Sequence, residues 1–437
     1  MSEHPNILFS DLELPESLLK GIREAGFESC TPIQARTLPQ ALEGRDIAGQ
    51  AQTGTGKTAA FLLAAFNHLH RNPQDSDTKT PSPRAVMLAP TRELAVQIHA
   101  DAQILGGATG LKMEVVFGGT DYEKQRKALE DGVDILIGTP GRFIDYFKQK
   151  VFSLRRVQVI VLDEADRMFD LGFIRDIRYV LRRLPPPEQR LNLLFSATLS
   201  QRVLELAYEH MNEPELVRIE PDKLTVDTVT QVVYFPSNEE KAPLLIGLLR
   251  SMEATRTMVF VNTKREAEYL ARLMQHNDVA AKAISGDVPQ RKRLSMLKDF
   301  QSGELPVLIA TDVASRGLHV PDVSHVVNYD LPQDPEDYVH RIGRTARAGA
   351  SGDAISFACE TFAFTLPEIE TFLGHRIPTG SIDISELPSI QKPPPAPRRR
   401  SGSPGKHGGK GPRAGKSGSP KSRRRPGKKA TGKKNPG

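Results

Sequence analysis

The sequence predicts an α/β protein with two tandem domains, each built on a parallel sheet, followed by a disordered basic C-terminal tail. Short β-rich runs alternate with helical patterns in residues 84–195, and a second series of the same kind begins at residue 258. Residues 392–437 have the composition of a chain that does not fold. A length of 437 residues, with 38% hydrophobic and 26% charged, suits two large cores.

The first series predicts a sheet whose strands are joined by crossover helices. Its expected strands are Arg84 to Ala89, Met113 to Phe117, Val133 to Ile137, Val157 to Leu162 and Leu191 to Phe195. The pattern lapses into polar, Pro-containing sequence around Asn212 to Asp227. The second series is expected to form strands at Met258 to Val261, Ala281 to Ile284, Val307 to Ala310, His325 to Asn328 and Ala354 to Ala358.

These patterns set the expected domain boundaries. We expect an N-terminal segment at 1–37, a first domain at 38–217, a linker at 218–228, a second domain at 229–388 and the tail at 389–437. Only the first domain carries a glycine-rich phosphate-binding loop, so the second must contribute something else to a shared function.

The charge of the chain is unevenly distributed. Residues 392–437 hold nine Lys and seven Arg with no Asp or Glu, and without them 43 basic residues face 53 acidic ones, a net of −10. A tail this poor in apolar groups cannot offset its ordering entropy, so we expect disorder. Its expected role is a nonspecific polyanion tether, and the alternative is a solubilising tail.

Cysteine usage and hydropathy indicate the cellular compartment in which the protein is expected. Cys30 and Cys359 lie far apart and fit no disulfide framework or metal spacing. No apolar run approaches eighteen residues, and the N-terminus has no secretory pattern. We therefore expect a cytoplasmic protein without membrane insertion.

Two segments of the first domain indicate nucleotide chemistry. The run from Val157 to Asp166 has the pattern of a buried strand that delivers Asp163 and Glu164 to its carboxyl end. Alone, such a pair is usually a solvated strand end. Here the loop Ala51-Gln-Thr-Gly-Thr-Gly-Lys-Thr58 precedes it, also after an apolar stretch. The loop suits phosphate and the carboxylates suit magnesium.

A basic segment in the second domain complements this pair. In the run from His340 to Arg347, Arg341, Arg344 and Arg347 recur at spacings of three and are expected near one face of a helix. Like charges so placed repel, so the face favours an anion opposite it. We expect an arginine finger for a γ-phosphate, with a solvated basic face as the alternative.

These segments and their order resemble the DEAD-box RNA helicases. The motifs that carry the resemblance are Ala51 to Thr58, Pro90-Thr-Arg-Glu-Leu-Ala95, Thr139-Pro-Gly-Arg142, Asp163-Glu-Ala-Asp166, Ser196-Ala-Thr198 and His340 to Arg347. Ala51 stands where the strict loop pattern has glycine, as in the helicase variant. The resemblance implies two RecA-like domains, an RNA-dependent ATPase, and ATP and Mg²⁺ as cofactors.

The resemblance also implies a role for individual residues. The implied catalytic residues are Lys57, Asp163, Glu164, Arg344 and Arg347. The residues implied to bind the nucleotide are Phe9, Gln34, Ala51, Gln52, Thr53, Gly54, Thr55, Gly56, Lys57, Thr58, Asp312 and Gly317, and those implied to bind the metal are Thr58 and Asp163. Gln34 would pair with the adenine edge while Phe9 stacks on its face, which predicts ATP over GTP. From the residues alone, Gln34 is equally well a polar residue at a helix start after Thr-Pro.

RNA contacts are expected to read sugar and phosphate, since the chain has no Trp and only 6% aromatic residues for base stacking. The residues implied for RNA are Pro90, Arg92, Gly119, Thr139, Gly141, Arg142 and Thr311. Those implied to couple hydrolysis to strand separation are Asp166, Ser196, Thr198 and His340. For Thr263 and Glu266, which have capping-box spacing, helix capping is at least as good an explanation as RNA contact.

Further segments resemble the RhlB-type bacterial branch of the family, which implies RNase E of the RNA degradosome as a partner for a monomeric helicase. They are Gly317-Leu-His319, Ala348 to Gly352, Ala358-Cys-Glu360 and the basic tail. Ala346 and His319 depart from the general family pattern at positions that complete closure over ATP. They suggest a weak intrinsic ATPase that needs a partner.

The expected activity is local opening of RNA duplexes driven by ATP binding and hydrolysis. An ATP-gated RNA clamp or scaffold, in which unwinding is incidental, is one alternative. A DNA-directed motor of related fold is another.

Overall fold

The computed structural model describes residues 7–51, 54–73, 80–219, 229–252, 255–315, 323–345, 352–383, 385 and 387–394. The predicted disordered tail lies outside these residues from position 395 onward. The predicted linker lies outside them from position 220 onward, and so do the predicted site residues Gln52, Thr53, Gly317 and Arg347. Residues His319 and Ala346 are outside them as well.

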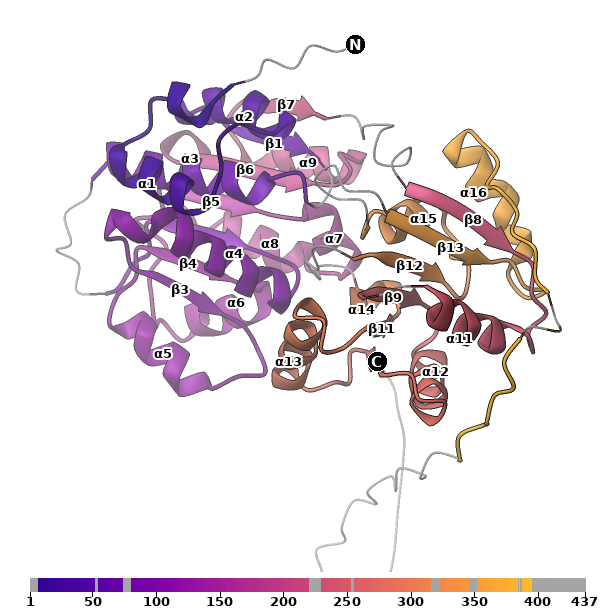
Figure 1. Cartoon of the computed structure of the whole chain (residues 1–437). Coiled ribbons are helices and arrows are strands. Elements are labelled where there is room, and N and C mark those ends of the chain that lie inside the picture. The colour runs from indigo at the N-terminus through magenta and orange to yellow at the C-terminus, as the bar shows by residue number, and fades with distance from the viewer. Residues whose placement is uncertain are drawn as a thin grey trace, which may run out of the picture. The chain divides into compact units, whose positions relative to one another are not determined.

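The first sheet is fully parallel and has seven strands in the order β3-β4-β2-β5-β6-β1-β7 (Figure 1). Its strands are β1 (Ile47–Gln50), β2 (Ala85–Leu88), β3 (Met113–Val116), β4 (Ile135–Gly138), β5 (Val159–Leu162), β6 (Leu191–Ser196) and β7 (Glu215–Arg218). The helices of this domain are α1 (Glu16–Glu24), α2 (Pro32–Leu42), α3 (Lys57–Arg71), α4 (Arg92–Gly106), α5 (Tyr122–Glu130), α6 (Pro140–Lys148), α7 (Ala165–Asp170), α8 (Ile174–Leu181) and α9 (Gln201–His210).

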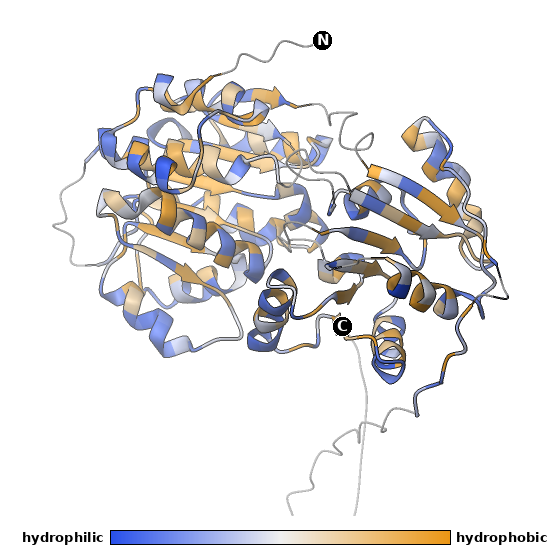
Figure 2. Ribbon diagram, in the orientation of Figure 1, coloured by the Kyte–Doolittle hydropathy of each residue, from blue (hydrophilic) through white to orange (hydrophobic). Residues whose placement is uncertain are grey.

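Alternate residues of the strands fill two cores, one on each face of the sheet. Met87 and Val161 pack with α1, α3 and α4, whereas their neighbours Val86 and Ile160 pack with α6, α8 and α9. Successive side chains of a strand point to opposite faces, and helices bury both, so the strands read as continuous apolar runs. Figure 2 shows these apolar strands inside more polar helices.

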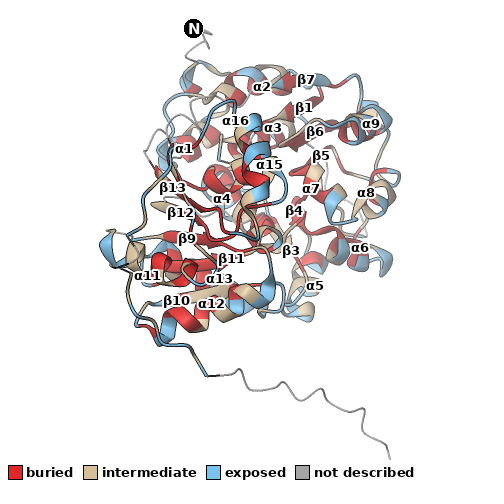
Figure 3. Cartoon of the chain, turned by 90° about the vertical axis from the view of Figure 1, so that its right-hand side faces the viewer, coloured by how far each residue is buried: buried red, intermediate tan, exposed pale blue. Residues whose placement is uncertain are grey.

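The second sheet is also parallel, with six strands in the order β10-β11-β9-β12-β13-β8. Its strands are β8 (Val229–Tyr234), β9 (Thr257–Phe260), β10 (Ala281–Ile284), β11 (Val307–Ala310), β12 (His325–Asn328) and β13 (Gly352–Phe357). Its helices are α11 (Lys241–Ser251), α12 (Lys264–His276), α13 (Gln290–Gln301), α14 (Asp312–Ser315), α15 (Pro335–Ile342) and α16 (Leu366–Leu373). The central strands β9 and β11 are buried along their whole length, whereas β8 and β10 at the two edges are only partly buried (Figure 3).

The predicted α/β class with two parallel sheets is confirmed, and all ten predicted strands are present. The prediction was wrong around Asn212 to Asp227, where β7 forms, and its strands included neither β1 nor β8. Thr263 caps α12, because its Oγ1 accepts the Glu266 N–H at 3.1 Å. None of the described helices combines the length and apolar character needed to cross a membrane.

Candidate nucleotide and nucleic-acid site

A cavity of about 420 Å³ lies in the first domain, where the phosphate loop and the carboxyl end of β5 meet. In parallel α/β sheets this edge is where ligands bind. The lining residues are Ala25, Phe27, Ser29, Thr31, Gln34, Gly54, Gly56, Lys57, Thr58, Ala59, Leu94, Gln97, Asp101, Ile104, Leu105, Asp163 and Glu164.

The phosphate loop needs glycine for two separate reasons. Gly54 and Gly56 have φ angles of 89° and 90°, in the left-handed region that other residues avoid. A Cβ atom at Gly56 would also lie 2.4 Å from Gln34 Nε2. Ala51, by contrast, is buried outside the cavity lining, and its N–H donates to the Ser196 carbonyl at 3.0 Å.

Lys57 opens α3 directly behind this loop. Its side chain is only 5% exposed, and its Nζ is buried without a hydrogen-bond partner among the described residues. A buried cation without its hydrogen bonds is costly, so the site is complete only with an anion. The N-terminus of α3 adds unpaired backbone N–H groups and positive helix-dipole charge, the combination that binds phosphate.

Asp163 and Glu164 follow β5 and line the same cavity. Glu164 has a φ of 52° and precedes α7, and its N–H donates to Asp163 Oδ1 at 2.9 Å. Complete burial raises the pKa of Asp163 to about 6, although the Lys57 charge acts to lower it. A cation at this carboxylate would remove the burial cost, which is the behaviour of a metal ligand.

No group of three or more His, Cys, Asp or Glu side chains capable of holding a metal occurs in the described part of the chain. The protein ligands at Asp163 and Thr58 are therefore too few to hold Mg²⁺ alone. This fits a metal that arrives with phosphate oxygens, because Mg²⁺ is usually bound by one or two carboxylates together with substrate phosphates.

Gln34 connects the cavity to the phosphate loop. Its Oε1 accepts the Thr31 N–H at 2.8 Å, and its Nε2 donates to the Gly56 carbonyl at 2.9 Å. The structure therefore shows the helix-start role that the sequence left open, together with a contact to the loop. Gln34 is also part of the cavity lining.

The placement of Phe9 corrects a prediction. Phe9 is 2% exposed, belongs to the first core and does not line the cavity. Its ring stacks against Phe27, with centroids 6.2 Å apart and planes inclined by 24°. Phe27 is 41% exposed and lines the cavity, so it is Phe27 that can present a ring to a ligand. Phe27 lies seven residues before Gln34, closer in sequence than Phe9, and this proximity was the signal that could have identified it.

A polar link joins the segment after β5 to the segment after β6. Asp166 N–H donates to Ser196 Oγ at 3.2 Å, and Thr198 N–H donates to Asp166 Oδ2 at 3.2 Å. The expected hydrogen bonds between these two motifs are thus present.

The first-domain residues implied for RNA lie at the ends of β2, β3 and β4. Arg142 on α6 lies over the Tyr122 ring, 4.8 Å from its centroid, and donates to the Tyr146 hydroxyl at 3.3 Å. Thr139 and Pro140 begin α6, with no side-chain cap on its N-terminus. Gly141 is exposed in the first turn, and Pro90 is buried before α4.

Arg92, the first residue of α4, lies against a glycine pair. A Cβ atom at Gly119 would lie 2.5 Å from Arg92 Nη1, and one at Gly118 would lie 3.3 Å from Nη2. The absence of side chains at both positions makes room for the guanidinium. Arg92 and Arg142 therefore both have defined surroundings.

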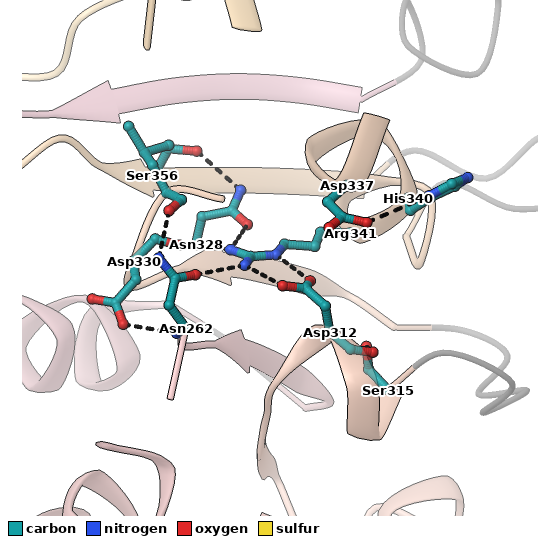
Figure 4. Close-up of polar contacts among 10 residues, drawn as sticks. Asn262, Asp312, Ser315, Asn328, Asp330, Asp337, His340, Arg341 and Ser356 are labelled. Carbon is teal, nitrogen blue, oxygen red and sulfur yellow. Dashed lines mark hydrogen bonds and ion pairs between the residues drawn. The ribbon is translucent and has the colours of Figure 1, made fainter. Parts of the chain in front are cut away.

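In the second domain, Arg341 is not part of an exposed basic face, which corrects the expectation for the arginine run. Helix α15 ends at Ile342, before Arg344, and Arg341 is 1% exposed. Its guanidinium donates to Asp312, Asn262 and Asn328 and to the Asp330 carbonyl (Figure 4). All five N–H donors are used, so none is left for a phosphate.

The remaining second-domain candidates surround this network. Both carboxylate oxygens of Asp312 accept from Arg341, at 2.6 and 2.7 Å, and Thr311 precedes it after β11. His340 Nδ1 lies 3.9 Å from Asp337 Oδ1. Arg344 is 6% exposed directly after α15.

Comparison with known proteins agrees with these features. Residues 31–206 match the DEAD/DEAH box helicase family, and residues 240–349 match the helicase conserved C-terminal domain. A relative named ATP-dependent RNA helicase RhlB, from Xanthomonas axonopodis pv. citri, is 56% identical over 400 residues, which cover 91% of this chain and 70% of the relative. One of the same name from Enterobacter sp. is 54% identical over 419 residues, covering 96% and 98%.

Solved structures show the same relationship. S. cerevisiae Dbp5 bound to RNA and ADP BeF3 has a TM-score of 0.75 and 34% identity, covering 85% of this chain and 95% of Dbp5. Mss116p bound to ssRNA and AMP-PNP has a TM-score of 0.75 and 28% identity, covering 88% and 81%.

Proposed function

Since the chain belongs to the DEAD/DEAH box helicase family, we propose that it is an ATP-dependent RNA helicase that couples ATP binding and hydrolysis to local opening of RNA duplexes. The observation that carries this proposal is the cavity in which the unpartnered ammonium of Lys57 meets the carboxylates of Asp163 and Glu164. Lys57 supplies a cation that can bind phosphate, Asp163 a buried carboxylate that can bind a metal, and Glu164 a second carboxylate that can bind water.

The triphosphate is proposed to lie along the loop from Gly54 to Thr58. Lys57 neutralises its terminal oxygens, and backbone N–H groups of the loop bind the rest. Thr58 and Asp163 would hold Mg²⁺, which when bound neutralises phosphate charge and orients the terminal phosphoryl group. Glu164 orients or deprotonates the attacking water.

The base is proposed to stack on Phe27, which replaces Phe9 in the role first expected. Gln34 already uses its amide on Thr31 and Gly56. A base that pairs with Gln34 therefore exchanges partners with these groups, so base binding changes the support of the phosphate loop. This connection makes loop geometry depend on which nucleotide is bound.

Hydrolysis is proposed to need both domains. Arg344 and, outside the described residues, Arg347 would supply positive charge to the γ-phosphate when the domains close. Arg341 then acts in the second domain, where it holds Asp312 beside Thr311 instead of contacting phosphate. Nucleotide contact by Asp312 is accordingly proposed through its backbone, because its carboxylate is occupied.

RNA is proposed to bind through its backbone. Arg92, Arg142 and the N-terminus of α6 at Thr139 would contact phosphates, and Thr311 would contribute from the second domain. Contacts of this kind give little sequence specificity, and the 2′-hydroxyl distinguishes RNA from DNA. The hydrogen bonds that join Asp166 to Ser196 and Thr198 are proposed to couple ATP hydrolysis to strand separation.

The wider setting is proposed from the relatives' names and the composition. Relatives named RhlB cover most of this chain, and we propose a monomer in the cytoplasm that acts in RNA degradation with RNase E as a degradosome component. The sixteen positive charges of residues 392–437 would tether RNA without sequence preference.

The test is the rate of ATP hydrolysis with and without single-stranded RNA, at low and moderate salt. Wild type is compared with Glu164→Gln and with a chain truncated after Gln391. The expected result is RNA-stimulated hydrolysis that Glu164→Gln abolishes and truncation preserves at saturating RNA. Hydrolysis that RNA does not stimulate, even with nuclease fragments added, would contradict the proposal.

A further inference from the structure

Helix α4 lines the cavity beyond the end of the Pro90–Ala95 motif, with residues that belong to no motif of the family. Gln97 and Asp101, one helical turn apart on α4, line it together with Leu105, which lies in the first core. Phe27 lines the same cavity from the segment after α1. This wall is therefore largely apolar with two polar side chains.

Both polar side chains offer hydrogen-bond acceptors to the cavity, and one of these acceptors has no donor. Burial raises the pKa of Asp101 to about 6 in spite of a hydrogen bond from Gln97. An ionised carboxylate only accepts, so the Gln97 amide must direct its Nε2 toward Asp101. Gln97 Oε1 is then left as a free acceptor, and it is buried without a hydrogen-bond partner in the described part of the chain. A buried unmet acceptor costs about 1 to 3 kcal/mol.

The lining of the cavity thus has two kinds of polar group. The Lys57 ammonium and the N-terminus of α3 are donors suited to phosphate. Gln97 and Asp101 on α4 are acceptors, and they line the same cavity as the Phe27 ring. A phosphate group at Asp101 would meet a carboxylate. The group that fits these acceptors is uncharged and flat and carries N–H or O–H donors.

We propose that Asp101 and Gln97 form a second recognition element for the nucleoside end of the nucleotide, and that they accept hydrogen bonds from its donor groups. This inference rests on the proposed ATP-binding function. At ring position 6 adenine has an amino donor and guanine a carbonyl acceptor, so an acceptor wall favours adenine. Gln34 already has backbone partners at both ends of its amide, so base selection does not depend on it alone.

The ribose hydroxyls are donors too, and the test separates the two sources. Equilibrium binding of ATP is compared with that of purine riboside triphosphate, which lacks the 6-amino group, and of 2′,3′-dideoxy-ATP, which lacks both hydroxyls. The proteins are full-length wild type, Asp101→Leu and Gln97→Met. Gln103→Met is the matched control, because Gln103 is exposed on the same helix and lies outside the cavity lining.

Wild type is expected to bind ATP about tenfold more tightly than the analogue that lacks the donor group bound by Asp101 and Gln97. This is the effect of one hydrogen bond to a charged group. Asp101→Leu is expected to bind ATP and that analogue equally. In Gln97→Met the ratio of the affinity for ATP to the affinity for the analogue is expected to fall at least threefold. Gln103→Met keeps the wild-type ratio. The analogue that loses affinity identifies the donor as the 6-amino group or the ribose.

An unchanged ATP-to-analogue ratio for both analogues in Asp101→Leu would overturn the inference while leaving the proposed function intact. A merely structural role of Asp101 would weaken all ligands alike and leave the ratio unchanged. If Asp101→Leu does not fold, the ratio of ATP affinity to analogue affinity in Gln97→Met tests the inference in its place. A wild type that binds no ATP would remove the proposed function itself, and the inference with it.

Discussion

The Arg341 guanidinium donates to both carboxylate oxygens of Asp312, through Nε at 2.6 Å and Nη2 at 2.7 Å. This bidentate pair joins the end of α15 to the start of α14, and Asn262 and Asn328 accept the remaining side-chain bonds (Figure 4). Segments that the sequence places far apart are therefore held in one arrangement. The arginine fixes the position of Thr311 and Asp312 for whatever they contact.

Exchange of Arg341 for lysine should therefore destabilise the second domain. Lysine has three donors at one point and cannot reproduce a planar fork with five, so Arg341→Lys leaves buried acceptors unmet. The expected loss in the free energy of unfolding is about 3 to 5 kcal/mol, measured by urea denaturation.

Arg178→Lys is the matched control for that exchange. Arg178 binds Glu205 and Glu209 at 3.1 and 3.0 Å, with 32% of its side chain exposed. Its change should cost at most about 1 kcal/mol. Equal effects of the two exchanges would show that burial of the Arg341 network contributes nothing.

The geometry of Gly56 predicts a specific loss on substitution by alanine. Both the φ of 90° and the 2.4 Å approach of Gln34 Nε2 oppose a methyl group there. Gly56→Ala should destabilise the apo protein by about 2 kcal/mol and abolish ATP binding. Gly44 has a similar φ of 86°, but a Cβ atom there would meet nothing within 4 Å. Gly44→Ala should therefore lower the free energy of unfolding by about 1 kcal/mol and bind ATP normally. Normal ATP binding by Gly56→Ala would rule out this view of the loop.

The stacked pair of Phe9 and Phe27 predicts opposite consequences for the same substitution. Phe9→Ala should lower the free energy of unfolding by about 3 to 5 kcal/mol, because Phe9 is fully packed. Phe27→Ala should cost about 1 kcal/mol in stability and about tenfold in ATP affinity. Thermal unfolding and nucleotide titration of both variants give the comparison. An ATP affinity that is lowered by Phe9→Ala and not by Phe27→Ala would restore the original assignment.

The raised pKa of Asp163 predicts a pH-dependent cost in stability. Its folded pKa of about 6 exceeds its ordinary value of 3.8, so the folded state holds the proton more tightly. Stability contributed by this group is present below about pH 4, falls as the pH rises toward 6, and stays lost above 6. Asp163→Asn should therefore stabilise the apo protein by about 1 to 3 kcal/mol above pH 6 and have little effect near pH 4.

The measurement is urea unfolding of wild type and Asp163→Asn between pH 4 and 8. The same variant should lose the stabilisation that ATP and magnesium give the wild type, because a bound ligand stabilises only what binds it. A stability difference that does not change with pH would contradict the burial argument.

The central strands were predictable because helices bury both faces, which leaves continuous apolar runs such as Val159–Leu162. Strand β7 was not, because this four-residue edge strand buries only Val217 and has no apolar run or alternation of its own. It exists through its pairing with β1, a contact that local sequence does not encode.

The residues of the candidate site also divide into those that were predictable from the sequence and those that were not. Lys57, Asp163 and Glu164 were predictable because each belongs to a short contiguous motif with one chemical purpose. Asp101 was not, since it belongs to no such motif and lines the cavity from α4, which packs against α1. That packing depends on Gly21, where a Cβ atom would lie 2.1 Å from the Leu105 carbonyl. No spacing along the chain indicates such an approach.

The most direct test of the central claim is strand release from a short RNA duplex, counted as duplexes opened per protein molecule with ATP present. Wild type should open many duplexes per molecule. Glu164→Gln is expected to bind ATP without hydrolysing it, so it should open at most one. A wild type that hydrolyses ATP in the presence of RNA but releases no strands would contradict the helicase assignment and leave an ATP-gated RNA clamp.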